Sequence, residues 1–356
     1  MKILIAAGIY PPDIGGPATY SKLIAEEFPR LGHETVVIVY NRRLPKMLRH
    51  LVYFWKALLH GRGADVIFAQ DPVSVGLPAM VAAKVLRKKF VLKVVGDYAW
   101  EQGIQRFGVR DLLDDFLNKK YSWRVEGLRR IETFVARRAH RVITPSHYLK
   151  GVVRHWGVSE KNVAVIPNAA PAILQNSARS GNKEIMFISI GRLVPWKGFR
   201  MLIELMRDFP QAKLSIIGEG PEQEHLKSEI RNLELEGRVF LVGRKTKEEI
   251  AVYYRDATLF FLNTGYEGFS HQLLEVMASG VPIITTDAGG NKEIVKNDEN
   301  ALTVSYNKKQ EWREAVKKLL GDGELRARLA ENAEKTAGRY TKEVMIQRTI
   351  ETLQSL

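Results

Sequence analysis

The chain has 356 residues, a hydrophobic fraction of 45% and a charged fraction of 26%, the composition of a soluble globular protein with room for two domains. It contains no cysteine, which excludes disulfides and thiolate chemistry and fits a reducing, cytoplasmic location. The net charge of +14 lies almost entirely in residues 1–170, where 27 Lys and Arg accompany 14 Asp and Glu, against 27 and 26 in the remainder. The first half is therefore expected to face something anionic.

The N-terminal stretch MKILIAAGIYPPD holds one lysine and a short apolar run that ends at Pro-Pro. It lacks the small-residue cleavage site of a signal peptide, so we interpret it as a buried first strand. No stretch of the chain reaches the roughly 18 apolar residues that a membrane-spanning helix needs.

The first half alternates short β-branched runs with helical stretches. The expected strands are 2–9, 34–40, 64–70, 90–96 and 141–146, and the expected helices lie near 17–30, 45–60, 75–88 and 110–140. Strands that carry Val and Ile on both faces and alternate with helices predict a parallel sheet covered on both sides.

The loop between the first strand and the first helix reads YPPDIGGPATY, and Gly15 and Gly16 open the helix. The spacing is not G-x-G-x-x-G, which argues against a dinucleotide-binding fingerprint. Two interpretations stay open: a double-glycine loop that donates N–H groups to a diphosphate, and a plain tight turn.

The stretch RRLPKMLRHLVYFWKALLHGRG, residues 42–63, predicts a basic amphipathic helix with an apolar stripe. The stripe consists of Leu44, Leu48, Leu51, Trp55 and Leu58. We favour a helix that packs on the sheet through this stripe; the alternative is a helix that lies on an anionic membrane. Residues 106–141 add aromatic side chains among cations. The basic half as a whole predicts contact with an anionic membrane surface.

A small, polar stretch at 168–183 predicts a linker, after which the strand–helix alternation starts again. The expected strands are 184–191, 213–220, 238–243, 257–263, 281–287 and 301–305, and residues 324–354 are expected to be helical. Ligands of open α/β sheets bind at the carboxyl ends of the strands, so the loops there are the places to seek chemistry.

Two of these loops combine glycines with cations. GRLVPWKGF places Arg192 and Lys197 between a strand and a helix, where charge and free N–H groups would both favour a phosphate. The alternative is a pair of solvated surface cations. Gly243 and Arg244 end another strand, where a backbone could contact a flat base; this signal is weak by itself.

The stretch GYEGFSHQLLEVMASGVP, residues 265–282, holds two carboxylates, Glu267 and Glu275. A helix is expected from near Phe269 to Gly280, with Glu267 before it and Glu275 in its middle. Eight residues span roughly 12 Å at helical rise, about the reach from the sugar to the ribose of a nucleotide sugar. Carboxylates can bind vicinal hydroxyls with two oxygens. The alternative for Glu275 is a buried ion pair with a distant arginine.

The chain resembles the family-4 retaining glycosyltransferases over nearly its whole length. The likeness is strongest in GRLVPWKG, IIGEGPE, VGRKTKEEI and EGFSHQLLEVMASGVPIITTDAGGNKEIV, and it extends to PPDIGGPATYSKLIAEEFPRLGHE and RVITPSHYLKGVVRHWGVSEKNVAVIPN. It implies two Rossmann-like α/β domains with parallel sheets facing across a cleft, the GT-B type. It implies an acceptor-binding domain at 1–168, a nucleotide-sugar-binding domain at 169–336, and a C-terminal helix, 337–356, that packs back on the first domain.

The resemblance also implies a reaction: a hexose-type sugar passes from a UDP or GDP donor to a glycan or a lipid-diphosphate-linked acceptor, with retention, in polysaccharide or glycolipid synthesis. Arg192 and Lys197 would hold the diphosphate, and Glu275 the ribose. Glu267 would meet the sugar, assisted by Gly268, Phe269 and Ser270. No cofactor and no metal are expected, and the sequence contains no Asp-x-Asp triplet.

The sequence departs from the family after its fourth strand, where many members have a histidine and this chain reads VVGDYAWEQG. We predict Asp97 as a catalytic group near the sugar, with a helix cap as the equal alternative. The family's expected mechanism lets the leaving phosphate take the acceptor proton, so a protein base is not required.

Functions of other classes explain less of the sequence. A nucleic-acid-binding protein would account for the basic half, but no groove-reading motif is present and no nucleic acid is expected. A sugar-nucleotide epimerase of the same shape would act without an acceptor. The enzyme is expected in the cytoplasm, with the cytoplasmic face of the membrane as the alternative location.

Overall fold

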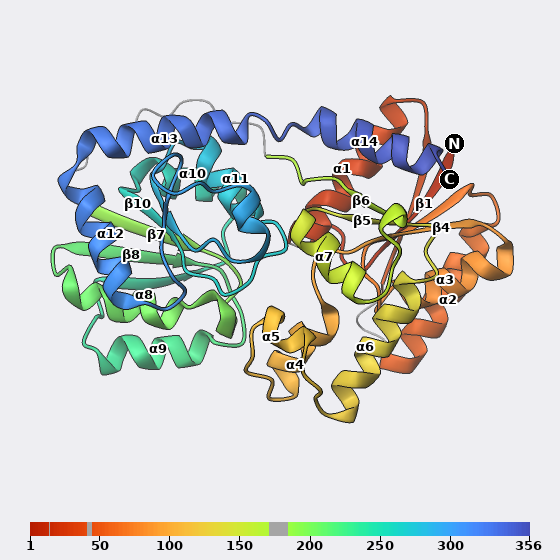
Figure 1. Cartoon of the computed structure of the whole chain (residues 1–356), viewed down its shortest axis with the longest axis horizontal. Coiled ribbons are helices and arrows are strands. Elements are labelled where there is room, and N and C mark those ends of the chain that lie inside the picture. Colours follow the sequence, from red (N-terminus) through yellow and green to blue (C-terminus); the bar gives the residue numbers. More distant parts are fainter. Residues whose placement is uncertain (14, 41–44, 171–183) are drawn as a thin grey trace. The chain divides into compact units, whose positions relative to one another are not determined.

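The computed structural model describes residues 1–13, 15–40, 45–170 and 184–356, which form two units (Figure 1). Unit 1 comprises Met1–Asn168 and Glu343–Leu356, and unit 2 comprises Ala169–Lys342. Leu44 of the predicted stripe and residues 171–183 of the predicted linker lie outside the described residues.

Unit 1 is built on a six-stranded parallel sheet in the order β2-β1-β3-β4-β5-β6. Its strands are β1 (Lys2–Ala7), β2 (Glu34–Val39), β3 (Val66–Ala69), β4 (Lys89–Lys93), β5 (Arg141–Thr144) and β6 (Val163–Val165). Its helices are α1 (Gly16–Arg30), α2 (Lys46–Gly61), α3 (Gly76–Leu86), α4 (Tyr98–Arg106), α5 (Leu113–Leu117), α6 (Trp123–Ala136), α7 (His147–His155) and α14 (Lys342–Gln354). The central strands are buried on both faces, as parallel strands between helices must be.

The direction of each crossover assigns the helices of unit 1 to two layers. The chain moves one way from β1 to β2 and the opposite way from β2 to β3, β4 and β5. Right-handed crossovers therefore place α1 on one face of the sheet and α2, α3 and α6 on the other (Figure 1). Helix α14 lies with α1 (Figure 1), and Thr349 of α14 and Tyr20 of α1 are both buried.

Unit 2 repeats this architecture with the order β12-β11-β10-β7-β8-β9. Its strands are β7 (Ile185–Ile190), β8 (Ala212–Ile217), β9 (Val239–Gly243), β10 (Leu259–Leu262), β11 (Ile283–Thr285) and β12 (Leu302–Thr303). Its helices are α8 (Phe199–Leu205), α9 (Gln223–Asn232), α10 (Lys247–Asp256), α11 (His271–Ala278), α12 (Lys309–Gly321) and α13 (Gly323–Ala337). All described strand pairs are parallel.

The core of unit 2 has two halves, one on each face of the sheet. Phe261 of β10 packs against Phe187 and Trp312, with ring centroids 4.8 and 5.7 Å away. The preceding residue, Phe260, points to the other face of the sheet and joins the hydrophobic cluster that includes residues of α11 and α13. This alternation follows from the two-residue period of a strand.

The predicted fold class is confirmed, and the errors are local. The structure adds strand β6 and helices α4 and α7 of unit 1, which the sequence patterns did not predict. The helix expected at 110–140 is two helices, α5 and α6. The helix expected at 324–354 is also two, α13 and α14, with a break at residues 338–341.

The prediction for the basic helix is wrong in one respect. We expected the stripe on α2 to pack on the sheet, but Leu48, Leu51 and Trp55 are 46, 55 and 53% exposed. Helix α2 packs through Tyr53, Ala57 and Leu58, which are buried; of these only Leu58 belongs to the predicted stripe.

Candidate functional site

The candidate site lies where the strand order of unit 2 changes direction. From β7 the chain proceeds to β8 and β9 on one side, and then returns to place β10 on the other side of β7. The loops that follow β7 and β10 therefore diverge at neighbouring positions of the carboxyl edge. Such switch points are where open α/β sheets bind their ligands.

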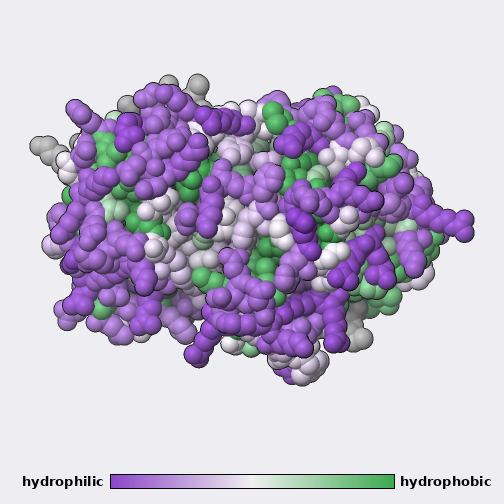
Figure 2. Space-filling view, viewed as in Figure 1, coloured by the Kyte–Doolittle hydropathy of each residue, from purple (hydrophilic) through white to green (hydrophobic). Residues whose placement is uncertain are grey.

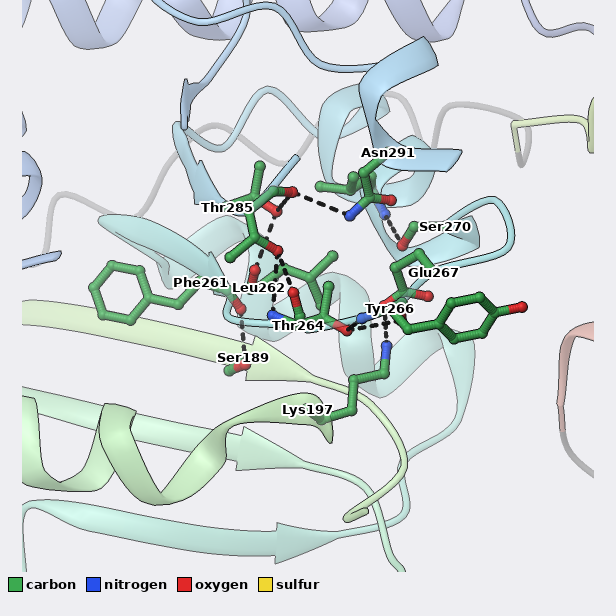
Figure 3. Close-up of polar contacts among 12 residues, drawn as sticks. Ser189, Lys197, Phe261, Leu262, Thr264, Tyr266, Glu267, Ser270, Thr285 and Asn291 are labelled. Atoms are coloured by element: carbon green, nitrogen blue, oxygen red, sulfur yellow. Dashed lines mark hydrogen bonds and ion pairs between the residues drawn. The ribbon is translucent and has the colours of Figure 1, made fainter. Parts of the chain in front are cut away.

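Lys197 and Glu267 meet at this switch point. Lys197 ends the short turn Pro195–Lys197 after β7, and Glu267 lies in the loop between β10 and α11. Their side chains form an ion pair and are 9 and 13% exposed (Figure 3). The Gly265 N–H donates to the Trp196 carbonyl oxygen at 2.8 Å, which ties the two loops together beside the pair.

The glycines of the neighbouring loops are required by close backbone packing. A methyl group on Gly218 would lie 2.0 Å from the carbonyl oxygen of Gly191, and one on Gly220 would lie 2.3 Å from that of Leu193. Gly218 also has a φ of +140°, which favours glycine. The glycines of GRLVPWKG and IIGEGPE thus allow the loops after β7 and β8 to contact each other without intervening side chains.

Helix α11 carries the second carboxylate. Ser270 caps the helix by accepting from the Leu273 N–H at 3.3 Å, and Leu274 is buried in the core. Glu275 is half-buried, and burial raises its pKa, opposed by the positive charge of Lys247. Within the described part of the chain the Glu275 carboxylate makes no hydrogen bond or ion pair. A desolvated carboxylate without a partner is costly, and such groups concentrate at binding sites.

The distant-arginine alternative for Glu275 therefore finds no support. Its neighbours are instead Lys247 and Tyr254 of α10, the helix that follows the loop of Gly243 and Arg244. Gly243 has a φ of +73°. Arg244 is paired with Glu219 at 3.2 Å, and both side chains are about half exposed.

The remaining predicted donor residues differ in exposure. Arg192 is exposed and its guanidinium lies 5.4 Å from the centre of the Trp196 ring. Phe269 is buried, with its ring 5.5 Å from that of Tyr340. Gly268 lies between Glu267 and the cap of α11.

A buried polar network that the sequence analysis missed supports the Glu267 loop. Thr286 donates through its hydroxyl to the Thr264 carbonyl oxygen, and the Thr264 hydroxyl donates to Tyr266 O at 2.9 Å (Figure 3). The Gly290 N–H donates to the Glu267 carbonyl oxygen at 2.8 Å. The available signal was the run of small polar residues directly after two buried strands, in FFLNT and IITTD.

In unit 1 the structure shows the capping role of Asp97. Its carboxylate accepts from the Trp100 N–H at 2.7 Å at the start of α4, and the residue is 1% exposed. Glu132 of α6 accepts from the N–H groups of Tyr98 and Ala99 at the same helix start. Burial raises the pKa of both carboxyls, and the charge of Asp97 raises that of Glu132 further. The cap is thus present, and a catalytic role for Asp97 near the sugar stays a prediction.

Gly15 and Gly16 lie where the sequence placed them. Gly15 precedes α1 with a φ of +150°, and Gly16 is the first residue of the helix, followed by Pro17. The positive φ requires glycine at the first of these positions. The tight-turn interpretation is therefore sufficient for Gly15, and diphosphate binding there stays a prediction.

Asp71 is a candidate binding residue that the sequence analysis did not identify. It follows β3, which adjoins β1 at the point where the strand order of unit 1 reverses. One carboxylate oxygen accepts from the N–H groups of Val73 and Ser74 at 2.8 and 2.6 Å, and the other lies against Gly8. Burial raises the pKa of Asp71 to about 6. A sequence signal existed, since the acid directly follows a buried strand.

No three His, Cys, Asp or Glu side chains are grouped as a metal site in the described part of the chain. None of the described helices is long and apolar enough to span a bilayer.

Comparison with protein families decides the identity of the chain. The model described as Glycosyltransferase Family 4 matches residues 14–171, and that described as Glycosyl transferases group 1 matches residues 172–336. The chain belongs to the family-4 glycosyltransferases. Together the two matches span residues 14–336 of this glycosyltransferase, which include every predicted donor residue.

Two individual relatives show how similar this chain is to other glycosyltransferases. It is 28% identical, over 169 residues, to the lipopolysaccharide core biosynthesis glycosyltransferase LpsE of Rhizobium meliloti, which covers 47% of this chain and 49% of that protein. The chain thus spans about half the length of this relative. It is 23% identical to an uncharacterized glycosyltransferase of Methanocaldococcus jannaschii, over 96% of this chain and 95% of that one.

Solved structures show the same fold. Anabaena HepE, crystallised in complex with UDP and glucose, aligns over 100% of both chains with a TM-score of 0.81 and 21% identity. The GT-B fold expected from the resemblance is confirmed.

Proposed function

We propose that this family-4 glycosyltransferase moves a hexose-type sugar from a nucleotide-diphosphate donor to a glycan or lipid-linked acceptor, with retention at the anomeric carbon. One observation carries the proposal: the Lys197–Glu267 ion pair occupies the switch point of unit 2, followed by a helix on which Glu275 has no hydrogen-bond partner in the described part of the chain. In this proposal Lys197 binds the diphosphate, Glu267 binds the sugar, and Glu275 binds the ribose.

The proposed donor contacts follow from charge and exposure. Lys197 is the buried cation, and the exposed Arg192 would contact a second phosphate oxygen. Glu275 would accept hydrogen bonds from the ribose hydroxyls, which supplies the partners that its carboxylate lacks. Gly243 leaves an open backbone for the base, since a methyl group there would meet no atom within 4 Å.

The proposed reaction exchanges one bond to the sugar for another. The bond between the anomeric carbon and the donor phosphate oxygen breaks as the acceptor oxygen forms its bond on the same face. The acceptor proton passes to the leaving phosphate. Lys197, Arg192 and the N-terminus of α11 would neutralise the negative charge that develops on the diphosphate, and we propose that no metal is needed.

The acceptor is assigned to unit 1, at the carboxyl edge of its sheet. Asp71 offers a half-buried carboxylate there. Burial raises the pKa of Tyr40, which follows β2, and the charge of Asp71 contributes to the same shift. The Tyr40 hydroxyl lies 2.9 Å from Nε2 of His50. These groups can bind the hydroxyls of a sugar acceptor. The lipopolysaccharide role of LpsE supports an acceptor in surface glycan synthesis. A cytoplasmic location stays a prediction.

Donor binding is the first test. Thermal shift and calorimetry would compare UDP, GDP and ADP and their sugar conjugates, starting with UDP-glucose because HepE was crystallised with UDP and glucose. We expect one nucleotide family to stabilise the protein, and Glu275→Gln to weaken its affinity by about 10- to 100-fold, the loss of hydrogen bonds to a charged group. Glu324→Gln, an exposed acid on α13, is the matched control. Equal affinity in both variants, or no response to any nucleotide, would overturn the donor site.

A further inference from the structure

The helix layer α2–α3–α6 of unit 1 carries most of the large hydrophobic residues that are exposed in the described part of the chain. The described part of the chain has twelve large hydrophobic residues that are exposed, and eight of them lie on these three helices: Leu48, Leu51, Trp55, Leu59, Val81, Val85, Trp123 and Phe134. Right-handed crossovers place the three helices on one face of the sheet, and α3 contacts both neighbours. Figure 2 shows hydrophobic residues reaching the surface between hydrophilic ones in this part of unit 1.

The exposed residues of α2 form a continuous stripe. Leu48, Leu51, Trp55 and Leu59 are spaced by three or four residues, which puts them on one face of the helix. The inner face of α2 is already packed: a methyl group on Gly61 would lie 2.9 Å from the Leu86 side chain of α3. The stripe is therefore apolar surface that the core of unit 1 does not use, and a patch of this kind marks an interaction site.

The charge around this surface has a single sign. Residues 42–64 and 72–96, which include all of α2 and α3, contain no Asp or Glu. Lys56 on α2 and Lys84 on α3 are exposed beside the stripe. The two acids of α6 are both occupied, since Glu126 pairs with Arg129 at 3.0 Å and Glu132 is buried at the start of α4. A partner that complements the charge of this layer must therefore be anionic.

Helix α6 adds an arginine-rich hollow to the same layer. The hollow is lined by Arg129, Arg130, Thr133, Phe134, Arg137 and Arg138. The guanidinium of Arg138 lies 3.6 Å from the centre of the Phe134 ring, so cation and exposed aromatic form one unit. Arginine beside an aromatic ring suits a boundary where phosphate groups meet apolar chains.

We propose that the outer surface of α2, α3 and α6 docks on an anionic lipid bilayer. The α2 stripe would enter the boundary between head groups and acyl chains, while the lysines and arginines around it would bind lipid phosphates. A second copy of the chain would bring like charges together, and a nucleic acid would leave the aliphatic stripe in water. This surface is independent of the donor site, so the proposal does not rest on the proposed reaction.

Vesicle flotation tests the apolar part of the proposal. The full chain is mixed with phosphatidylcholine vesicles that contain or lack phosphatidylglycerol, at low and at high salt. We expect binding only to the anionic vesicles, and Leu51→Ser/Trp55→Ser/Leu59→Ser to lower the partition coefficient by at least about tenfold through lost apolar burial. Phe240→Ser/Val252→Ser, two exposed apolar residues of unit 2, is the matched control and should bind like the wild type.

A second pair of variants tests the charge. Lys56→Glu/Lys84→Glu should lower binding to anionic vesicles by at least about tenfold. Arg207→Glu/Lys317→Glu makes the same change in charge on exposed positions of unit 2 and should bind nearly like the wild type. Thermal midpoints of all variants show whether each still folds, since these side chains are exposed.

Three results would overturn the proposal. The first is wild-type protein that stays with the soluble fraction in the presence of anionic vesicles. The second is equal loss of binding in the unit 1 variants and their unit 2 controls, which would mean unspecific attraction by net charge. The third is a dimer, measured by light scattering, that the serine variant converts to a monomer while vesicle binding is unchanged; the stripe would then be an interface between copies.

Discussion

The Lys197 ammonium and the Glu267 carboxylate, 70 residues apart in sequence, pair across the point where the strand order of unit 2 reverses. Both side chains are largely buried, and an unpaired charge at either position would destabilise the fold. Each side chain therefore neutralises the charge of the other. The loop hydrogen bonds from Gly265 to Trp196 and from Gly290 to Glu267 hold the pair in position before any donor binds. The proposed donor would therefore meet a cation and a carboxylate that are already in place.

Removing one partner of this pair should cost more than removing both. Lys197→Ala leaves a partly buried carboxylate alone, so we expect a lower thermal midpoint and at least about tenfold weaker donor binding. Lys197→Ala/Glu267→Ala should recover part of the thermal stability but not the donor affinity. A double-mutant cycle on the thermal midpoint measures the coupling. The exposed pair Lys227–Glu224 is the comparison, and its coupling should be near zero. Equal coupling for both pairs would contradict a structural role for the buried pair.

The loop glycines give a test of packing. Gly220→Ala should destabilise unit 2 by about 1–3 kcal/mol, because its methyl group would overlap the Leu193 carbonyl oxygen and that backbone has no room to move. Gly321, at the end of α12, has no atom within 4 Å of such a methyl group. Gly321→Ala should therefore be neutral or slightly stabilising. Chemical denaturation of the two variants checks this, and a neutral Gly220→Ala would show that the loops are less closely packed than described.

The Asp97–Glu132 pair predicts an unusual dependence of stability on pH. Burial raises the folded-state pKa of Asp97 to about 6, and that of Glu132 well above its ordinary value. The folded chain then holds more protons than the unfolded chain, so this pair makes the free energy of unfolding fall as pH rises from about 4 through 6 and beyond, by up to ~1.4 kcal/mol per pH unit for each proton. Glu132→Gln should weaken this trend.

The comparison is made between thermal midpoints at pH 5 and pH 8. The thermal midpoint of Glu132→Gln minus that of the wild type should be larger at pH 8 than at pH 5. Glu26→Gln, an exposed acid on α1, should show the same difference at both pH values. A constant offset for Glu132→Gln would mean that the pKa of Glu132 is the same in the folded and the unfolded chain, which would contradict the prediction.

The two aspartates of unit 1 should differ in their effect on catalysis. Asp97→Asn keeps an oxygen that can cap α4, so we expect a transfer rate within about twofold of the wild type. Asp71→Asn removes the negative charge at the carboxyl edge of the sheet, and we expect at least about tenfold lower kcat/KM for the acceptor with donor affinity unchanged. Steady-state kinetics with both substrates decide this. The opposite result would restore Asp97 as the group near the sugar.

The stereochemistry of the product tests the proposed reaction. Nuclear magnetic resonance of the anomeric proton should show the same configuration in the product as in the donor. Inversion would contradict the proposed mechanism. A change in the sugar nucleotide without any acceptor would identify an epimerase instead.

The strands, the two parallel sheets and the positions of the donor loops could be predicted from the sequence. Runs such as KILIAA and IMFISI are apolar on both faces, and only a central parallel strand between two helix layers buries both. Loops at the carboxyl ends of such strands follow directly. The carboxylate of Glu275 was recognisable too, because an acid among Leu273, Leu274 and Met277 has no simple structural explanation.

The tertiary structure alone decided which charges meet and which faces are covered. An ion pair between residues 197 and 267 depends on the order in which strands join the sheet, and the one-dimensional pattern does not contain that order. The same holds for Asp71, whose place at a reversal is a property of the sheet. For α2 the pattern showed an apolar stripe but not its direction, since a helix with small residues on its other face can pack through those. Periodicity specifies that a face exists, and only the neighbouring elements determine whether it lies in the core or in contact with another partner.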